Sequence, residues 1–169
     1  MSQITNYKGI KKIYFEKIIF EIIKIAKLDI NQKIILDYGC GEKYLYKVLK
    51  KKILNFDKNP KYTEIENIDN QKFDIIVMNH VLMYFSKDEI NNFFDKIYKK
   101  NSKCEFVIGI GKQNIISKLA KNLTFNFNAH KGTKTTYIEQ IKCIEDKMNI
   151  ISSKKNIFYM TDIFYTKFK

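Results

Sequence analysis

Short apolar runs rich in β-branched residues alternate with longer stretches of helical spacing along this chain. The clearest runs are residues 33–38 (KIILDY), 73–78 (FDIIVM) and 105–110 (EFVIGI). Strands that alternate with helices predict a mostly parallel sheet with helices on both faces. We therefore expect an α/β protein, a three-layer sandwich with a Rossmann-like sheet.

The remaining segments complete that pattern. Apolar residues at helical spacing predict a first helix at about residues 8–27, and further helices at 43–51, 87–99, 114–121 and 137–148. Ser86 followed by Glu89 predicts a capping box at the start of the helix at 87–99. Residues 53–56 and 64–68 are expected to add short strands, and the runs around 157–158 and 163–168 an antiparallel C-terminal hairpin. The prediction is a seven-stranded sheet in which one strand or helix is reduced.

Size and composition indicate one domain spanning residues 1–169, because 169 residues can bury a substantial core and no linker interrupts them. There is no apolar run long enough for a membrane span and no secretory-signal layout in residues 1–7. Cys40, Cys104 and Cys143 are odd in number and widely spaced, which argues against a disulfide framework and a zinc site. We expect a cytoplasmic protein without a metal.

The net charge of +13 comes entirely from lysine, since all 31 basic residues are Lys and none is Arg. Lysine, isoleucine and asparagine share adenine- and thymine-rich codons, so genome composition explains much of this bias. Arginine, which reads phosphates and guanines through paired hydrogen bonds, is absent. A solvated surface is the favoured interpretation, with a polyanion site as the alternative. The positive field would also attract an anionic substrate.

A glycine-rich turn joins the first strand to the following helix, in the segment LDYGCGE that contains Asp37, Gly39 and Gly41. Glycines there allow a tight turn and a close approach to a ligand. Asp57 ends the second strand, where an acid can accept hydrogen bonds from two ribose hydroxyls. The nicotinamide fingerprint G-x-G-x-x-G fails, because Tyr44 occupies its third glycine position. A plain structural turn, with Asp57 as a helix cap, is the alternative to a nucleoside site.

LDYGCGEKYL resembles the first motif of the class I S-adenosylmethionine-dependent methyltransferases, D-x-G-x-G-x-G, and the chain is most similar to their small, type 11-like members. LNFDKNP resembles the second motif, FDIIVMNHVLMYF the fourth strand with its loop, and EFVIGIG the fifth strand. The terminal hairpin matches the reversed last strand of the family. The motifs run in the family's order from residue 33 to the end of the chain.

The resemblance implies S-adenosylmethionine as cofactor, and it implies a set of binding residues. These are Gly39, Cys40 and Gly41 under the methionine, Asp37 organising that loop, Asp57 on the ribose, Lys58 beside the adenine, and Asn79 and His80 near the sulfonium. Lys43 replaces the third glycine of the motif. The stretch between Asp57 and Phe73 is short, which leaves Glu64 and Asp69 as alternative adenine contacts.

His80 and His130 are the candidate general bases, needed only if the methylated atom is a hydroxyl. Each is equally well explained as a structural or surface histidine. Tyr84 and Tyr137 are further candidates for substrate contact, although packing is the usual role of tyrosine.

The predicted function is methyl transfer to a small-molecule acceptor, with an O, N, S or C nucleophile left open. Nucleic-acid amine methyltransferases of the family carry an Asn/Asp-Pro-Pro-aromatic motif, whereas this chain has Asn79-His80-Val81-Leu82. Two alternatives remain: an RNA methyltransferase that uses the lysines, and a non-catalytic relative that acts as an interaction module. For the latter, the basic and apolar helix at 8–27 is the natural surface for a protein or a membrane.

Overall fold

The computed structural model describes residues 10–112 and 132–169. Its helices are α1 (Ile10–Ala26), α2 (Tyr44–Leu49), α3 (Lys87–Lys100) and α5 (Tyr137–Lys147), with short 3₁₀ turns η1 (Ile68–Asn70) and η2 (Leu82–Tyr84). Its strands are β1 (Ile35–Tyr38), β2 (Leu54–Phe56), β3 (Ile75–Asn79), β4 (Glu105–Gly111), β5 (Met148–Ile157) and β6 (Thr161–Phe168). The expected helix at 114–121 lies outside the described residues.

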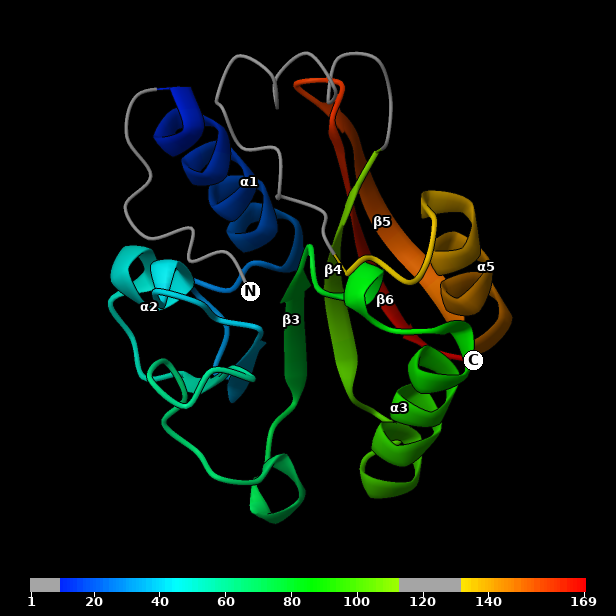
Figure 1. Ribbon diagram of the computed structural model, residues 1–169. Helices are drawn as coiled ribbons and strands as arrows, with labels where there is room; N and C mark the ends of the chain where they lie inside the picture. The colour runs from blue at the N-terminus through cyan, green and yellow to red at the C-terminus, as the bar shows by residue number, and fades with distance from the viewer. Residues whose placement is uncertain (1–9, 113–131) are drawn as a thin grey trace.

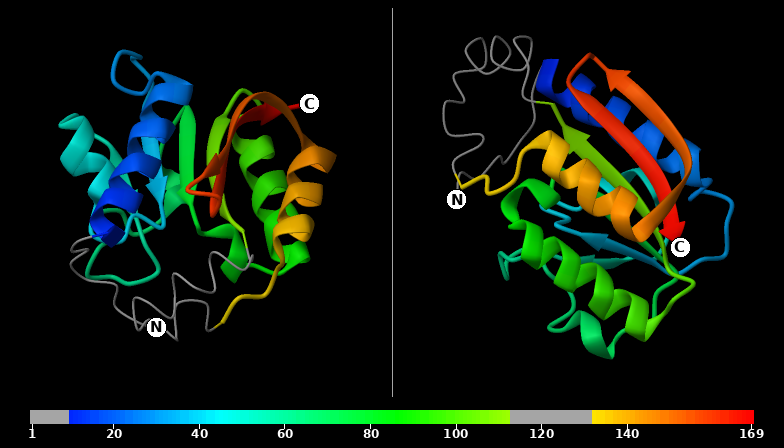
Figure 2. Two further views of the ribbon diagram at one scale, coloured as in Figure 1. Left: turned by 90° about the horizontal axis from the view of Figure 1, so that it is seen from above. Right: turned by 90° about the vertical axis from the view of Figure 1, so that its right-hand side faces the viewer.

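The strands form one sheet in the order β2-β1-β3-β4-β6-β5, parallel from β2 to β4. Helices α1 and α2 cover one face and α3 and α5 the other (Figure 1, Figure 2). This is the three-layer Rossmann-like sandwich expected from the alternation of strands and helices. The carboxyl ends of β1, β3 and β4 point to one edge, which we call the carboxyl edge.

Two hydrophobic clusters, one on each face, hold the layers together, because successive residues of a strand point to opposite faces. In β3, Ile75 and Val77 pack toward α1, whereas Ile76 and Met78 pack toward α3. Helix α3 begins with the expected capping box, in which the Glu89 N–H donates to the Ser86 hydroxyl and the Ser86 N–H to the Glu89 carboxylate. It buries Ile90, Phe93, Phe94 and Ile97 on its sheet-facing side.

Residues 64–68 do not form the expected strand. The described part of the sheet therefore has six strands, and β2 is an edge strand. The segment contains only two isoleucines among polar residues, too few to bury a strand. It still covers the backbone of β2. The Glu64 N–H and the Thr63 hydroxyl both donate to the Asn55 carbonyl, and the Asn55 side chain donates to the Glu64 carboxylate at 2.6 Å.

The C-terminal hairpin is confirmed, with β6 antiparallel to both β4 and β5. The predicted position of its first strand, around residues 157–158, is wrong, because β5 begins at Met148 and ends at Ile157. Phe158 belongs to the connecting turn, because the Met160 N–H donates to the Ile157 carbonyl across it. Since β6 runs antiparallel, this turn lies at the carboxyl edge, where Thr161 pairs with Gly111.

Candidate functional site at the carboxyl edge

The glycine-rich turn after β1 is fastened to the end of β2. The N–H groups of Gly39 and Cys40 donate to the Phe56 carbonyl at 2.7 and 3.2 Å. Gly39 has φ +81°, and a Cβ built on it would lie 2.4 Å from Cγ2 of Val81. Glycine is therefore required both for the conformation and for the approach of the loop after β3.

Asp57 closes this turn. Its Oδ2 accepts the Gly41 N–H at 2.9 Å, and its Oδ1 accepts the Asn59 N–H at 2.8 Å. A carboxylate has about four acceptor positions, so two hydrogen bonds leave capacity for ribose hydroxyls. The neighbouring Lys58 is exposed. The structure thus brings together the predicted residues of the first two motifs.

Lys43, at the third glycine position, keeps the glycine conformation, with φ +58° and ψ +43°. Its ammonium pairs with Glu64 Oε1 at 2.6 Å, and hydrogen bonds from Asn55 and then from Lys43 lower the pKa of that carboxyl. Of the two candidate adenine contacts, Glu64 is therefore the one tied to the glycine turn. Asp69 pairs with Lys96 of α3 at 2.7 Å.

Asp37 is 6% exposed beneath the turn. Burial, and then repulsion from the Asp57 carboxylate, raise its pKa to about 7. In the described part of the chain no hydrogen-bond donor contacts its carboxylate. Cys40 is also buried, and burial followed by the Asp37 and Asp57 charges raises the pKa of its thiol to about 12, so the thiol stays protonated.

Asn79 ends β3 with its side chain over the neighbouring strand β4. A Cβ at Gly109 would lie 2.4 Å from Asn79 Oδ1, so β4 has a glycine where this side chain needs room. The Oδ1 atom is buried and has no hydrogen-bond partner among the described residues. An unpartnered buried oxygen is costly, and it is suited to receive a donor from a ligand.

His80 follows in the left-handed region, at φ +57°. Its Nε2 lies 3.0 Å from the Thr161 hydroxyl, which also hydrogen-bonds the Tyr14 hydroxyl of α1. The ring contacts the rings of Tyr14 and Phe15. This network joins α1, β3 and β6 at the carboxyl edge, and the histidine's role as a base stays a prediction. His130 lies outside the described residues.

One polar cluster at this edge was not predicted from the sequence, although its Tyr137 was a candidate for substrate contact. Asp162 is 1% exposed, and its carboxylate binds the Lys112 ammonium at 2.9 Å and accepts the Tyr137 hydroxyl at 2.6 Å. Burial, and then the hydrogen bond to Asp162, raise the pKa of Tyr137. The available signal was an acid inside the apolar run at 161–168, but its two partners are brought to it only by the fold.

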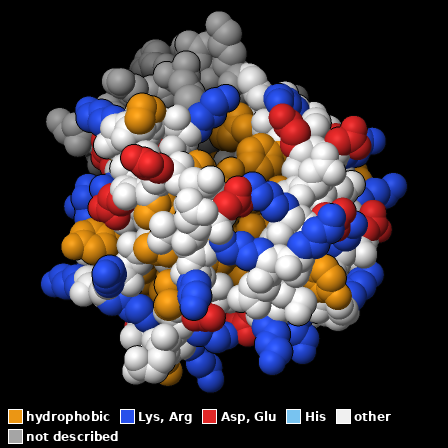
Figure 3. Space-filling view, turned by 90° about the horizontal axis from the view of Figure 1, so that it is seen from below, with side chains coloured by type: hydrophobic (Ala, Val, Ile, Leu, Met, Phe, Trp, Pro, Cys, Tyr) orange, Lys and Arg blue, Asp and Glu red, His pale blue; other side chains and the backbone are white. Residues whose placement is uncertain are grey.

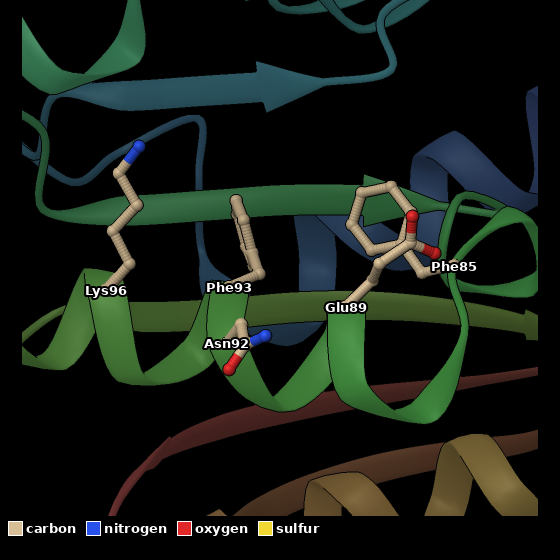
Figure 4. Close-up of a pocket in the computed structure, with 5 residues that line it drawn as sticks. All are labelled: Phe85, Glu89, Asn92, Phe93 and Lys96. Carbon is tan, nitrogen blue, oxygen red and sulfur yellow. The ribbon is translucent and has the colours of Figure 1, made fainter.

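A separate hollow of about 330 Å³ lies beside α3, lined by Phe85, Glu89, Asn92, Phe93 and Lys96 (Figure 4). Phe93 and Phe85 point toward the sheet there and form an aromatic cluster with Tyr38. The hollow is not formed by the residues of the glycine turn. Within residues 10–112 and 132–169 as a whole, no group of three or more His, Cys, Asp or Glu side chains could hold a metal.

No family model matches this chain. It is 32% identical over 166 residues to the protein Ycf2 of Physcomitrium patens, an alignment that covers 85% of this chain and 7% of that protein. Because the chain spans so small a part of that relative, the match does not assign it an activity.

Several solved structures share the fold. Magnesium protoporphyrin IX methyltransferase from Synechocystis PCC 6803, with bound S-adenosylhomocysteine, has a TM-score of 0.60 at 12% identity and covers 97% of this chain and 89% of its own. The N-methyltransferase NodS from Bradyrhizobium japonicum WM9, also with S-adenosylhomocysteine, has a TM-score of 0.61 at 12% identity and covers 92% and 87%. The PH0226 protein of Pyrococcus horikoshii OT3 has a TM-score of 0.64 at 11% identity, covering 92% and 91%.

The chain therefore has the Rossmann-like fold of class I S-adenosylmethionine-dependent methyltransferases, as its motifs predicted. Identities of 11–12% establish the fold alone. Within the described residues, no helix is long and apolar enough to cross a membrane.

Proposed function

We propose that this protein transfers a methyl group from S-adenosylmethionine to a small-molecule acceptor. The observation that carries the proposal is the hydrogen bond from the Gly41 N–H to Asp57, which closes a glycine turn on an acid at the carboxyl edge of a methyltransferase fold. The proposal includes a single domain over residues 1–169. The buried, free state of all three cysteines fits a reducing compartment such as the cytoplasm.

The residues present fit the cofactor. Gly39, Cys40 and Gly41 would lie under its methionine part, and Asp57 would accept hydrogen bonds from its ribose hydroxyls, with Lys58 next to the adenine. Two features are suited to a cationic, hydrogen-bond-donating ligand: the Asp37 carboxylate without a donor and the unpartnered Asn79 Oδ1. When bound, S-adenosylmethionine supplies a methyl group already activated by its sulfonium.

The protein's own contribution is to orient the acceptor and to exclude water. Asn79 and His80 stand at the end of β3, beside the glycine turn through the Gly39–Val81 contact. A hydroxyl acceptor needs a base, and His80 or His130 would take its proton. For His80 this requires either that Nε2–H donate to the Thr161 hydroxyl, so that Nδ1 takes the proton, or that Thr161 give way to the acceptor at Nε2. A carboxylate or thiolate acceptor needs no base.

A small-molecule acceptor is supported by the absence of a Pro-Pro-aromatic motif after Asn79. Solved structures of this fold include enzymes named for magnesium protoporphyrin IX and for mitomycin. The alternative is an RNA acceptor, whose phosphates would be bound by the excess of lysine side chains. Figure 3 shows lysines spread over one face and interspersed with Asp and Glu, which does not favour a single phosphate track on that face.

Thermal unfolding with S-adenosylmethionine, S-adenosylhomocysteine or NAD tests the proposal. At one hundred times its dissociation constant a ligand adds about 2.7 kcal/mol to the free energy of unfolding. We expect both sulfur nucleosides, and not NAD, to raise the melting temperature of the wild type and of Asp29→Ala, an exposed acid away from the turn. The increase should vanish in Asp57→Ala.

Because Asp57→Ala also removes the acceptor of the Gly41 N–H, Asn79→Ala serves as a second variant that leaves the turn intact. It should fold normally and bind the nucleosides more weakly. A wild type that unfolds cooperatively and gains no stability from either nucleoside would overturn the proposed function.

A further inference from the structure

The turn between β5 and β6 has two aromatic residues in a backbone conformation that side chains disfavour. Phe158 and Tyr159 have φ +48° and +57°, and the Met160 N–H donates to the Ile157 carbonyl at 3.0 Å. A hairpin turn with positive φ at both central residues strongly favours Asn-Gly or Gly-Gly. Strained positions of this kind concentrate at ligand sites, because a gain in function compensates for the strain.

Both rings are exposed despite their apolar character. Phe158 is 48% exposed and Tyr159 is 65% exposed, in a position where turns usually present small polar side chains. The turn conformation itself favours small residues, yet a large part of each aromatic ring remains accessible. The rings are therefore candidates for contact with another molecule.

The turn is connected to the proposed methyl-transfer site. The Phe158 ring lies 5.9 Å from the Tyr14 ring, at an angle of 61°. The Tyr14 hydroxyl binds that of Thr161, which in turn lies 3.0 Å from His80 Nε2. In Figure 1 the tip of the hairpin stands at the same edge as the end of β4 and the upper part of α1.

The base of the turn is firmly held. The Lys112 N–H donates to the Met160 carbonyl at 2.7 Å, and the Lys112 ammonium pairs with the buried Asp162. Tyr137 of α5 donates its hydroxyl to the same carboxylate. A rigid base lets the two rings present a surface whose geometry does not have to be ordered on binding.

We propose that Phe158 and Tyr159 bind a planar aromatic part of the methyl acceptor and so determine which acceptors are used. Aromatic side chains recognise planar rings by offset stacking or edge-to-face contact. The inference rests on the proposed function, since it assigns the acceptor side of the same site. It names the chemical class of the acceptor as a small planar aromatic molecule.

The double variant Phe158→Asn/Tyr159→Gly tests the inference, because it gives the turn its preferred residues and removes both rings. The probe is 2-naphthol, with its saturated counterpart decahydro-2-naphthol as the non-planar comparison, measured by calorimetry with S-adenosylhomocysteine present. We expect 2-naphthol to bind the wild type in preference to the saturated alcohol. The variant should bind 2-naphthol about tenfold more weakly, as the loss of two aromatic contacts predicts.

The variant should keep its affinity for S-adenosylhomocysteine, and its melting temperature should be unchanged or raised by about 3 °C, because strain is relieved. Tyr46→Gln, which removes a ring of similar exposure (47%) from α2, should bind 2-naphthol as the wild type does. The inference is overturned if 2-naphthol binds the wild type and the double variant equally, or binds neither, while both still bind S-adenosylhomocysteine. That result leaves the proposed function standing.

Failure of S-adenosylhomocysteine to bind the wild type overturns the proposed function itself. A twelve-residue oligouridine forms the last arm. Suppose that oligouridine binds the wild type but not the double variant, while the two proteins bind 2-naphthol equally. The two rings then bind nucleobases, and the proposal of a small-molecule acceptor is wrong.

Discussion

Asp37 lies buried at the end of β1, and burial together with the Asp57 carboxylate raises its pKa to about 7. In an unfolded chain an aspartate has a pKa near 4. Between these values the folded protein holds the proton more tightly than the unfolded chain does. This contribution to stability is therefore fully present below about pH 4 and is lost as the pH rises through 7. A cationic group bound beside the carboxylate would recover the loss.

Replacing Asp37 by Asn should consequently stabilise the ligand-free protein at high pH, because the amide cannot ionise. We expect the variant's advantage in free energy of unfolding to widen by about 3 kcal/mol between pH 4 and pH 8. Urea unfolding at both pH values measures it. Asp29→Asn, at an exposed position, should show no such widening. An advantage that is the same at both pH values would mean that Asp37 carries no burial cost.

Single residues were predictable where one local constraint dominates. Gly39 and Asp57 stand out because a tight turn and a strand-end acid are visible within a few residues. The cluster of Lys112, Tyr137 and Asp162 was not predictable, because its members are distant in sequence and meet through the register of β4 with β6 and the packing of α5. The unpartnered oxygen of Asn79 likewise depends on its neighbour β4.

At the scale of elements, α2 is a helix of six residues whose first flanking residue, Lys43, is left-handed and gives no side-chain cap. A residue with a Cβ loses about 1 kcal/mol or more in that conformation, and glycine does not. The ion pair of Lys43 with Glu64 has partners that are 27% and 47% exposed, so it contributes little. The family's glycine would suit this position better than lysine.

Lys43→Gly should therefore be more stable than Lys43→Ala by about 1 kcal/mol, although both lose the ion pair. Lys47, inside the same helix, provides the matched control. There the order should reverse, with the alanine variant more stable by about 1 kcal/mol. Thermal or urea unfolding of the four variants measures both differences. Alanine ahead of glycine at both positions would show that Lys43 is not strained.

Element boundaries followed from local pattern where burial and capping agree. Helix α3 matched because its capping box and its four buried apolar residues give the same boundaries. The expected strand at 64–68 is not formed. Hydrogen bonds of Asn55 with Thr63 and Glu64 cover the edge of β2 without a further strand. Phe158 was read as part of a strand because aromatic residues favour strands, whereas its place in the turn depends on a strained conformation that no propensity anticipates.

At the scale of the whole molecule, the lysine excess is distributed and partly engaged. The longest run, residues 50–52, includes Lys51, whose ammonium binds the carbonyls of Leu28 and Asn31 at 2.9 and 2.8 Å. Lys100 similarly binds the carbonyl of Ile68 at 2.8 Å. Other lysines pair with acids, as Lys147 does with Asp95. These ammonium groups are used within the fold, which reduces their availability for phosphates.

Such a distribution predicts weak binding of single-stranded nucleic acid. A net charge of +13 will attract it at low salt, but each contact with a phosphate adds to the salt dependence of the affinity. With lysines scattered among acids we expect a slope that corresponds to about two or three phosphates, measured as log affinity against log salt for oligouridine between 50 and 200 mM by fluorescence anisotropy.

Lys50→Gln/Lys52→Gln should change that slope no more than a pair of substitutions elsewhere, such as Lys24→Gln/Lys99→Gln, because no one run dominates. A slope that corresponds to six or more phosphates, or its selective loss in one pair, would reveal a continuous basic track. The acceptor would then have to be sought among nucleic acids. Otherwise the positive charge acts only as a general field around the carboxyl edge, drawing anionic small molecules toward it.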